Sequence, residues 1–477
     1  MAGGETGRGE AGMTSGGGLP GTAAGLTAAY KARSLSPVEV LVDAFARLDQ
    51  ITGSLNPVSH EDREASLAAA RASETRWLKG EPRSGLDGVV ATIKSNVMKT
   101  GWPMRRGSRL SPDAVMTFDA PCVASLERAG AVILCQTTMP EFGWKGTGDS
   151  PLTGVSRNPH DPSRTPGGSS AGAGVLAALG IGQVHIGTDG LGSIRIPASF
   201  CGVVGVKPSF GRVPAYPASP FGALAHIGPM ARTVADAVAM FQVIAQPDWR
   251  DMHAWNQVPP DLSEGLEAGV RGLTFAWSPT LGFVKGLDPE VLAICEKAVA
   301  ALEAAGAVVE RADPALDGDA MRRAADVLWQ AGAAALMSDM SDGHQSEQDQ
   351  RFVAAYKAGR RLSAVDVVKA HQFRAALAET MRQFHERHQI LLTPTMPITA
   401  IEVGRDTPAD GSWGEDWLNW SPYTYPFNLT GQPAASVPVG RTRAGMPVGL
   451  QLVASPRSTL LMRCARAVEA AAGYRHL

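Results

Sequence analysis

Two turns rich in glycine and serine carry the residue types best suited to chemistry. The first is Pro166-Gly167-Gly168-Ser169-Ser170, and the second is Thr188-Asp189-Gly190-Leu191-Gly192-Ser193-Ile194-Arg195. A serine that attacks a carbonyl group needs a base for its proton and N–H donors for the oxyanion that forms. In the second turn, Ser193 would supply the hydroxyl, and the backbone N–H groups of residues 190–193 would supply the donors. A helix N-cap or an anion-binding turn would explain the same residues.

No histidine directly adjoins either serine, so the base must come from another part of the chain. The candidate is Lys94, which follows the apolar segment Val89-Val90-Ala91-Thr92-Ile93. A lysine ordinarily titrates near about 10.4 and is then a poor base at neutral pH. Burial against apolar neighbours lowers the pKa, because the charged form loses its hydration. A surface or ion-paired lysine at the end of a strand is the alternative.

Several familiar motifs do not fit these residues. Neither turn has the Gly-Lys-Ser/Thr of a phosphate-binding P-loop, and Ser-x-x-Lys is absent from the chain. Gly168-Ser169-Ser170-Ala171-Gly172 matches G-x-S-x-G, but such a nucleophile elbow follows directly on a strand, and residues 163–167 make a poor strand. His385 and His388 lack the i, i+4 spacing of a helical zinc site. We expect no metal and no cofactor.

The turns must be positioned by a sheet and its helices. Strands are predicted at 88–93, 131–135, 183–187, 203–206, 390–394, 435–439 and 449–453, with the last two paired. Helices are predicted at 36–48, 61–78, 119–130, 171–179, 231–246, 289–305, 458–472 and over most of 319–387. The strand–helix–strand order around Lys94 implies parallel pairing. We therefore predict an α/β fold with a mixed, mostly parallel central sheet flanked by helices on both faces.

Length and composition set the outer limits. The 477 residues carry a net charge of −2, which argues against a dedicated nucleic-acid surface. The five cysteines are scattered and include no C-x-x-C pair, so a reducing compartment fits, and we expect a cytoplasmic protein. We expect a Gly-rich disordered tail at 1–21 and one large domain at 22–477, with a variable helical substrate-side region at about 247–387. No membrane partner is expected, and a homodimer is one option for assembly.

The turns and their surroundings resemble the amidase signature family of serine hydrolases. The likeness is carried by Pro166-Gly167-Gly168-Ser169-Ser170-Ala171-Gly172, Gly187-Thr188-Asp189, Gly192-Ser193-Ile194-Arg195-Ile196-Pro197, Phe200-Cys201-Gly202-Val203-Val204-Gly205 and Lys207-Pro208, with further matches at 158–159, 226–236 and 425–434. It spans about residues 25–245 and 388–473 and is highly specific.

The resemblance implies a Ser–cisSer–Lys triad. Ser193 would be the nucleophile, Ser169 the bridging serine after a cis Gly168–Ser169 peptide bond, and Lys94 the base. The resemblance also implies an oxyanion hole made by the N–H groups of Gly190, Leu191, Gly192 and Ser193. Ser170, Asp189 and Arg195 would brace the two loops.

The chain departs from the family pattern at several positions. Leu191 stands where a glycine is usual, so a side chain occupies the oxyanion loop and the geometry of the donors is in question. Ser95 follows Lys94 where an aspartate is usual, which leaves the orientation of the lysine open. Ala171 and Ala173 replace a glycine and a serine, a change expected to affect packing.

The substrate is the least specified part of the prediction. The resemblance places Gly143 and Trp144 in the acyl pocket, and a helical turn would bring Trp413, Trp417 and Trp420 together. Ordinary core is the alternative for these tryptophans. An aromatic wall would favour aryl or bulky apolar amides and, further, carbamates (urethanes), with esters as a side activity. The partners would then be such a small molecule and water.

Two other functions stay open. The family includes the A-type component of the tRNA-dependent amidotransferase, a glutaminase that works in a complex. Ile196 stands where that component usually has a glutamine, which argues against it. A non-catalytic binding protein on the same fold is the other, and the presence of Lys94, Ser169 and Ser193 argues against that.

Overall fold

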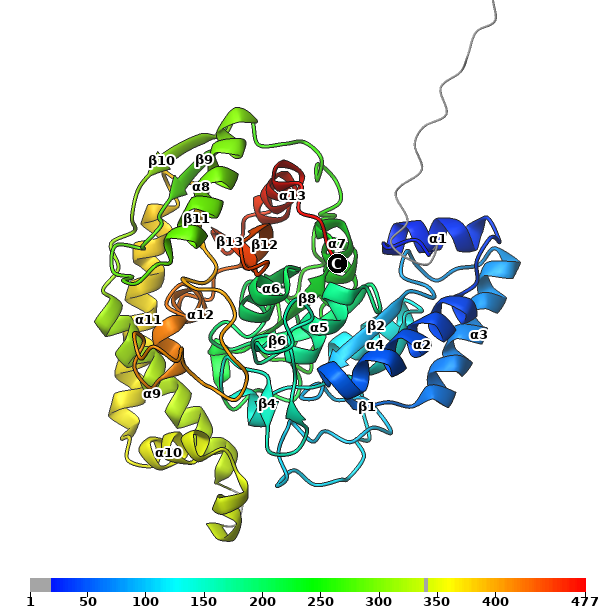
Figure 1. Cartoon of the computed structure of the whole chain (residues 1–477), viewed down its shortest axis with the longest axis horizontal. Coiled ribbons are helices and arrows are strands. Elements are labelled where there is room, and N and C mark those ends of the chain that lie inside the picture. The colour runs from blue at the N-terminus through cyan, green and yellow to red at the C-terminus, as the bar shows by residue number, and fades with distance from the viewer. Residues whose placement is uncertain (1–18, 339–341) are drawn as a thin grey trace, which may run out of the picture.

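An eleven-stranded sheet runs through the centre of the molecule (Figure 1). The computed structural model describes residues 19–338 and 342–477, so the predicted tail lies outside the described residues up to residue 18. The strands of the sheet are β1 (Val58–His60), β2 (Val90–Lys94), β3 (Val132–Thr137), β6 (Val184–Asp189), β7 (Val204–Lys207), β8 (His226–Ala231), β9 (Thr274–Trp277), β10 (Val308–Arg311), β11 (Ile390–Pro394), β12 (Ala434–Arg441) and β13 (Pro447–Ala454). The short strands β4 (Asp149–Ser150) and β5 (Gly154–Val155) form a separate pair.

The order across the sheet is β1-β3-β2-β6-β8-β7-β12-β13-β11-β9-β10. The predicted parallel pairing around Lys94 is confirmed, because β2 pairs in parallel with both β3 and β6. The prediction of a mixed α/β sheet is also confirmed, but "mostly parallel" is wrong. Only the pairs β2–β3, β2–β6, β9–β10 and β9–β11 are parallel, because β6, β8, β7, β12, β13 and β11 follow one another in antiparallel pairs.

Helices cover both faces of the sheet and both of its ends. They are α1 (Ala23–Lys31), α2 (Pro37–Leu55), α3 (Arg63–Lys79), α4 (Pro121–Arg128), α5 (Ala171–Leu179), α6 (Arg195–Cys201), α7 (Val234–Ile244), α8 (Pro289–Ala304), α9 (Gly318–Met337), α10 (Gln350–Gly359), α11 (Ala364–Phe384), α12 (Pro426–Leu429) and α13 (Leu460–Ala472). Four 3₁₀ turns are η1 (Glu141–Gly143), η2 (Gly222–Leu224), η3 (Asp342–Glu347) and η4 (Trp417–Trp420). No helix of the described residues is long and apolar enough to cross a membrane.

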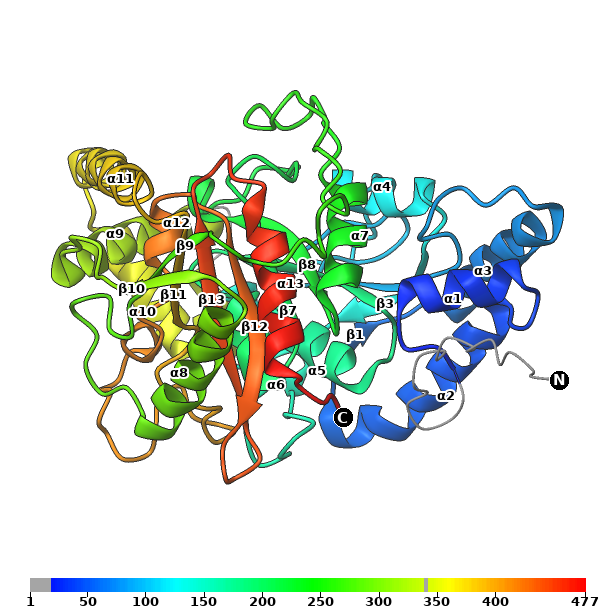
Figure 2. The same ribbon diagram turned by 90° about the horizontal axis from the view of Figure 1, so that it is seen from above.

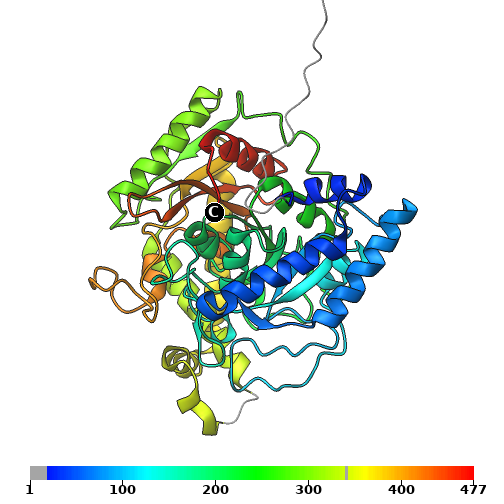
Figure 3. The same ribbon diagram turned by 45° about the vertical axis from the view of Figure 1, so that its right-hand side comes forward.

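The two ends of the molecule are built from different helices. Helices α1, α2 and α3 lie at one end, and α9, α10 and α11 lie at the other (Figures 1 and 2). Figure 3 brings the N-terminal helices in front of the central strands. The predicted helical region at 247–387 is not helical throughout, because it also contributes β9 and β10 to the sheet edge.

The side chains of β2 alternate between two cores, as the pleat of a strand requires. Ala91 and Ile93 pack in the cluster formed with α4 and α7, whereas Val90 packs on the other face with residues of α2 and α5. Lys94 shares the face of Val90 by this alternation. Helices α5 and α6 contact each other, and each begins directly after one of the two Gly/Ser turns. The fold therefore brings Lys94 and both turns to one face of the sheet.

Candidate active site

Lys94 is the last residue of β2 and is fully buried. Burial holds the pKa of Lys94 well below its ordinary value of 10.5, and the carboxylate of Asp189 opposes this effect only in part. The predicted buried strand and depressed pKa are thus what the structure shows. An amine in this environment can be neutral at a pH where an exposed lysine is charged.

Two hydroxyl groups contact the amine of Lys94. Its Nζ lies 2.7 Å from Ser169 Oγ and 2.9 Å from Thr188 Oγ1. A neutral amine has two N–H donors and one lone pair. If one N–H donates to Thr188 Oγ1, the lone pair is available to the hydroxyl hydrogen of Ser169. Ser169 also has the cis peptide bond to Gly168 that the resemblance implies.

Ser170 links the two turns. Its N–H donates to the carbonyl oxygen of Ser193 at 3.1 Å. Its hydroxyl donates to the carbonyl oxygen of Thr188 and accepts from the Thr188 N–H, both at 3.2 Å. The first turn is therefore held against β6 and the start of α6, as expected for a bracing residue.

Asp189 organises the second turn from below. Its carboxylate accepts from the N–H groups of Gly192 at 2.7 Å and Ile194 at 3.2 Å, and pairs with Arg195 at 3.0 Å. Burial alone would raise the pKa of Asp189, but Arg195 outweighs burial and holds the pKa below its ordinary range. The guanidinium also donates to Asn428 Oδ1 at 2.6 Å. This arrangement keeps Asp189 ionised and the loop closed around it.

This geometry changes the expected oxyanion hole. The N–H of Gly192 was predicted as a donor to substrate, but it donates to Asp189 instead. The reason is that the loop closes around the carboxylate before it reaches Ser193. Gly190, Leu191 and Ser193 then remain as the predicted donors.

Leu191 does not obstruct the cavity. Its side chain is fully buried and packs in an apolar cluster with Ile196, Phe200 and Leu224. The carbonyl oxygen of Leu191 accepts from Thr424 Oγ1 at 2.7 Å, which holds the peptide from the other side. The extra side chain therefore points into the protein and leaves the backbone of the loop facing the substrate side.

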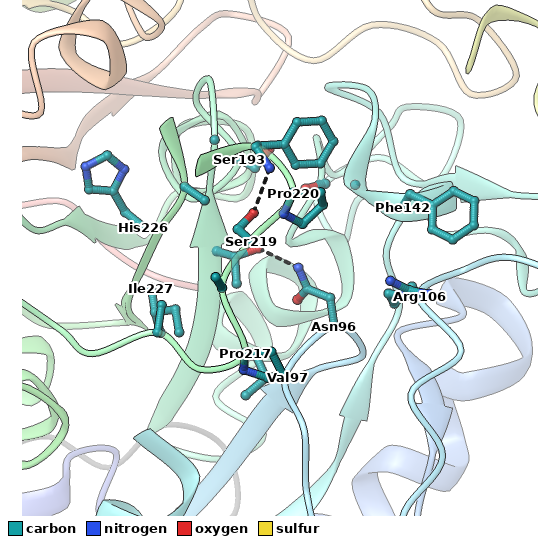
Figure 4. Close-up of a pocket in the computed structure, with 18 of the residues that line it drawn as sticks. Asn96, Val97, Arg106, Phe142, Ser193, Pro217, Ser219, Pro220, His226 and Ile227 are labelled. Carbon is teal, nitrogen blue, oxygen red and sulfur yellow. Dashed lines mark hydrogen bonds between the residues drawn. The ribbon is translucent and has the colours of Figure 1, made fainter. Parts of the chain in front are cut away.

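A cavity of about 210 Å³ opens over the two serines. Ser169, Ser193, Thr188, Gly190 and Gly143 line it, together with an aromatic group of Phe142, Phe221 and Trp329. Figure 4 shows Ser193 at the cavity with Phe142 and Arg106 on one side and His226 and Ile227 on the other. Gly143 must lack a side chain, because a Cβ there would lie 3.1 Å from Ser169 Oγ.

The remaining predicted substrate residues lie elsewhere. Trp144 stacks on Trp329 at a centroid distance of 5.8 Å and is not itself part of the lining. Trp413 and Trp417, predicted as a wall, are also outside the lining. Trp417 is in η4, where it packs on Trp420, and Trp413 lies near Gly286. Helical spacing correctly joined two tryptophans but could not say which cavity they approach.

Sequence reasoning missed several residues of the site. Trp329 comes from α9, and Phe221 stacks on it at a centroid distance of 3.9 Å. The apolar stripe of α9 shows that Trp329 is buried but not what it faces. Asn96 was also missed; its amide donates to Thr188 Oγ1 at 3.0 Å. Its position two residues after Lys94 was the available signal.

The mixed sheet, the buried lysine and the two turn serines at one cavity define a class of α/β serine hydrolase without a catalytic histidine beside the serines. A family model described as Amidase matches residues 39–459. An acylamidase of Rhodococcus erythropolis is 34% identical over 451 residues, which cover 93% of this chain and 94% of the relative. The chain belongs to the amidase signature family.

Other relatives widen the comparison. The A-type component of the glutamyl-tRNA(Gln) amidotransferase of Myxococcus xanthus (strain DK1622) is 35% identical over 475 residues, with 93% of this chain and 96% of the relative covered. A solved structure of a bacterial aryl acylamidase of the amidase signature family superposes with a TM-score of 0.88 at 28% identity, covering 94% of this chain and 96% of that chain. The family is thus shown, and it contains more than one activity.

Proposed function

We propose that the protein hydrolyses the C–N bond of linear amides with aryl or bulky apolar groups, and carbamates as a further class, through an acyl-enzyme on Ser193. The observation that carries this proposal is the 2.7 Å contact of Lys94 Nζ with Ser169 Oγ beside Ser193, at an aromatic-lined cavity. The similarity to an acylamidase and to an aryl acylamidase structure supports it.

The proposed proton path runs through Ser169. Neutral Lys94 accepts the proton of Ser169, which accepts that of Ser193 as the Ser193 oxygen attacks the carbonyl carbon. The N–H groups of Gly190, Leu191 and Ser193 donate to the oxyanion. The tetrahedral intermediate collapses, the path reverses to protonate the leaving amine, and water then releases the acid by the same route.

The substrate preference is inferred from the cavity wall. Trp329 and Phe221 present a stacked pair at the cavity, and Trp144 supports Trp329 from behind. Flat aromatic side chains bind aryl groups by offset or edge contacts worth about 0.5–1.5 kcal/mol beyond area burial. An anilide would gain from this wall, whereas acetamide is too small to use it.

Glutaminase activity within an amidotransferase complex is the second candidate, because a relative with that name is 35% identical. Ile196 is buried in the apolar cluster beside Leu191. It therefore offers no polar group to the site. Turnover of glutamine together with stable binding of a B-type component would favour this candidate over a free-standing amidase.

The proposal is tested with a hydrolysis panel of short aliphatic amides, anilides, aryl carbamates, p-nitrophenyl esters and glutamine. Lys94→Ala, Ser169→Ala and Ser193→Ala should each lower kcat/KM for the anilide by at least about 100-fold, because each removes a group that moves the proton or attacks. Ser111→Ala is the matched control, since Ser111 is buried, its hydroxyl has no hydrogen-bond partner in the described residues, and it lies outside the cavity lining. Undiminished turnover by Ser193→Ala would refute the mechanism, and equal turnover of acetamide and acetanilide would refute the aryl preference.

A further inference from the structure

Arg106 brings a positive charge to the cavity lining. Its guanidinium carbon lies over the ring of Phe142, 5.2 Å from the ring centroid. Its Nε is buried without a hydrogen-bond partner, and no acid pairs with it among residues 19–338 and 342–477. The acid in the lining, Asp189, is already paired with Arg195. The charge of Arg106 is therefore available to a ligand.

The backbone of Arg106 is held in an uncommon conformation. Its φ of 52° lies in the left-handed region, which few residues with side chains adopt and which often marks a functional position. Its carbonyl oxygen accepts from the N–H of Phe142 at 2.7 Å, and its N–H donates to the carbonyl oxygen of Ser95 at 3.4 Å. A Cβ on the following Gly107 would lie 2.6 Å from the carbonyl oxygen of Met139. This close packing fixes the turn and keeps Arg106 at the cavity.

The environment of the guanidinium favours an anionic partner. Burial lowers the pKa of Arg106, which shows that the charged form has lost part of its hydration. A cation–π contact such as that with Phe142 recovers about 0.5–2 kcal/mol. A carboxylate recovers more, because its two oxygens match two parallel N–H donors of the planar guanidinium. In Figure 4, Arg106 and Phe142 lie together on the side of the cavity that faces Asn96.

We propose that Arg106 is a specificity-determining residue that selects amide substrates bearing a carboxylate, which it binds beside Phe142 while Ser193 attacks the amide carbonyl. The proposal rests on the proposed function for the bond that is cleaved. It adds that the substrate is amphiphilic: an aryl or apolar group against Trp329 and Phe221, and an anionic end at Arg106.

Matched substrate pairs test this directly. One pair is N-phenylsuccinamate and N-phenylpentanamide, which place a carboxylate or a methyl-terminated chain on the acyl side. The other is 4-acetamidobenzoate and N-(4-methylphenyl)acetamide, which vary the amine side. For at least one pair, kcat/KM of the wild-type protein should be about 30-fold or more higher for the carboxylate, the effect expected of a partly buried charge pair. Arg106→Met should abolish this preference, and Arg106→Lys should restore only part of it.

Arg105→Met is the matched control. Arg105 is the preceding residue, pairs with Asp113 and lies outside the cavity lining. It should keep the carboxylate preference of the wild-type protein. If Arg105→Met removes the preference as fully as Arg106→Met does, the effect comes from general charge and the proposal is overturned.

A binding measurement separates this proposal from the proposed function. Calorimetry on the Ser193→Ala protein should show N-phenylsuccinamate or 4-acetamidobenzoate binding at least about tenfold more tightly than its neutral match, and Ser193→Ala/Arg106→Met should lose the difference. Equal binding of both members of both pairs overturns the role of Arg106 even where amides are hydrolysed. Hydrolysis of no amide by the wild-type protein, with the binding difference present, overturns the proposed function while the carboxylate site stands.

Discussion

The side chain of Trp329 packs directly on Gly190. A Cβ at Gly190 would lie 2.7 Å from Trp329 Cζ3, so the indole from α9 reaches the backbone of the loop that precedes Ser193. The same indole donates from Nε1 to the carbonyl oxygen of Trp144 at 3.3 Å. One residue from a distant helix therefore both walls the cavity and touches the proposed oxyanion loop.

Trp329→Ala should reduce the preference for aryl amides. Loss of the ring removes an aromatic contact and apolar area, so the ratio of kcat/KM for acetanilide over acetamide should fall by roughly 10-fold or more. Steady-state kinetics on both substrates measures this ratio. Trp413→Ala, at a tryptophan outside the lining, is the control and should keep the wild-type ratio. An unchanged ratio in Trp329→Ala would show that this wall does not contact the substrate.

The central part of the site could be predicted because its signals are local in the sequence. Ser169 and Ser193 lie in turns that must precede helices, and Lys94 ends a strand whose every residue is apolar or buried. The alternation of side chains along β2 then sets the face on which Lys94 lies. Few long-range contacts had to be known for these three positions.

The rest of the site depends on contacts between distant segments. Trp329 and Phe221 are 108 positions apart, and no spacing rule relates them. The tryptophans at 413 and 417 are near each other in sequence, which suggested a wall that the structure places elsewhere. The use of the Gly192 N–H by Asp189 follows from a side-chain orientation, which residue types alone do not specify. The antiparallel pairs at the centre of the sheet were missed for a similar reason, since strand order is a property of the whole chain.

Leu191→Ala should lower stability more than activity. The side chain is fully buried in an apolar cluster, so its truncation should lower the free energy of unfolding by about 2–5 kcal/mol. The backbone N–H of residue 191 persists, and kcat should fall by less than about 10-fold, well below the 10²–10³ lost with an oxyanion donor. Denaturant unfolding and single-turnover kinetics on the same samples give both values. A loss of kcat above about 100-fold in a folded variant would mean that the side chain sets the donor geometry.

Thr188→Val should impair the base without removing it. Thr188 Oγ1 receives hydrogen bonds from both Lys94 Nζ and Asn96 Nδ2, so it orients the amine toward Ser169. The isosteric valine has no acceptor, and kcat/KM should fall by about 10-fold or more while KM changes little. Because the hydroxyl is a partner of the amine, the pH at which activity declines should shift as well. A variant that merely loosens packing would lower stability and leave the shape of the pH–activity curve unchanged.

Lys94 should link both activity and stability to pH. The neutral amine is the proposed base, so kcat/KM should fall as the pH drops below the depressed pKa of Lys94 in the folded protein. Between that pKa and about 10.4, the unfolded chain binds a proton at Lys94 that the folded protein does not, so stability rises with pH across this window. Lys94→Met removes this proton and should reduce the slope of unfolding free energy against pH by up to about 1.4 kcal/mol per pH unit. Denaturant titrations of both proteins at several pH values measure the slopes. Identical slopes would mean that Lys94 is charged in the folded protein and cannot act as the base.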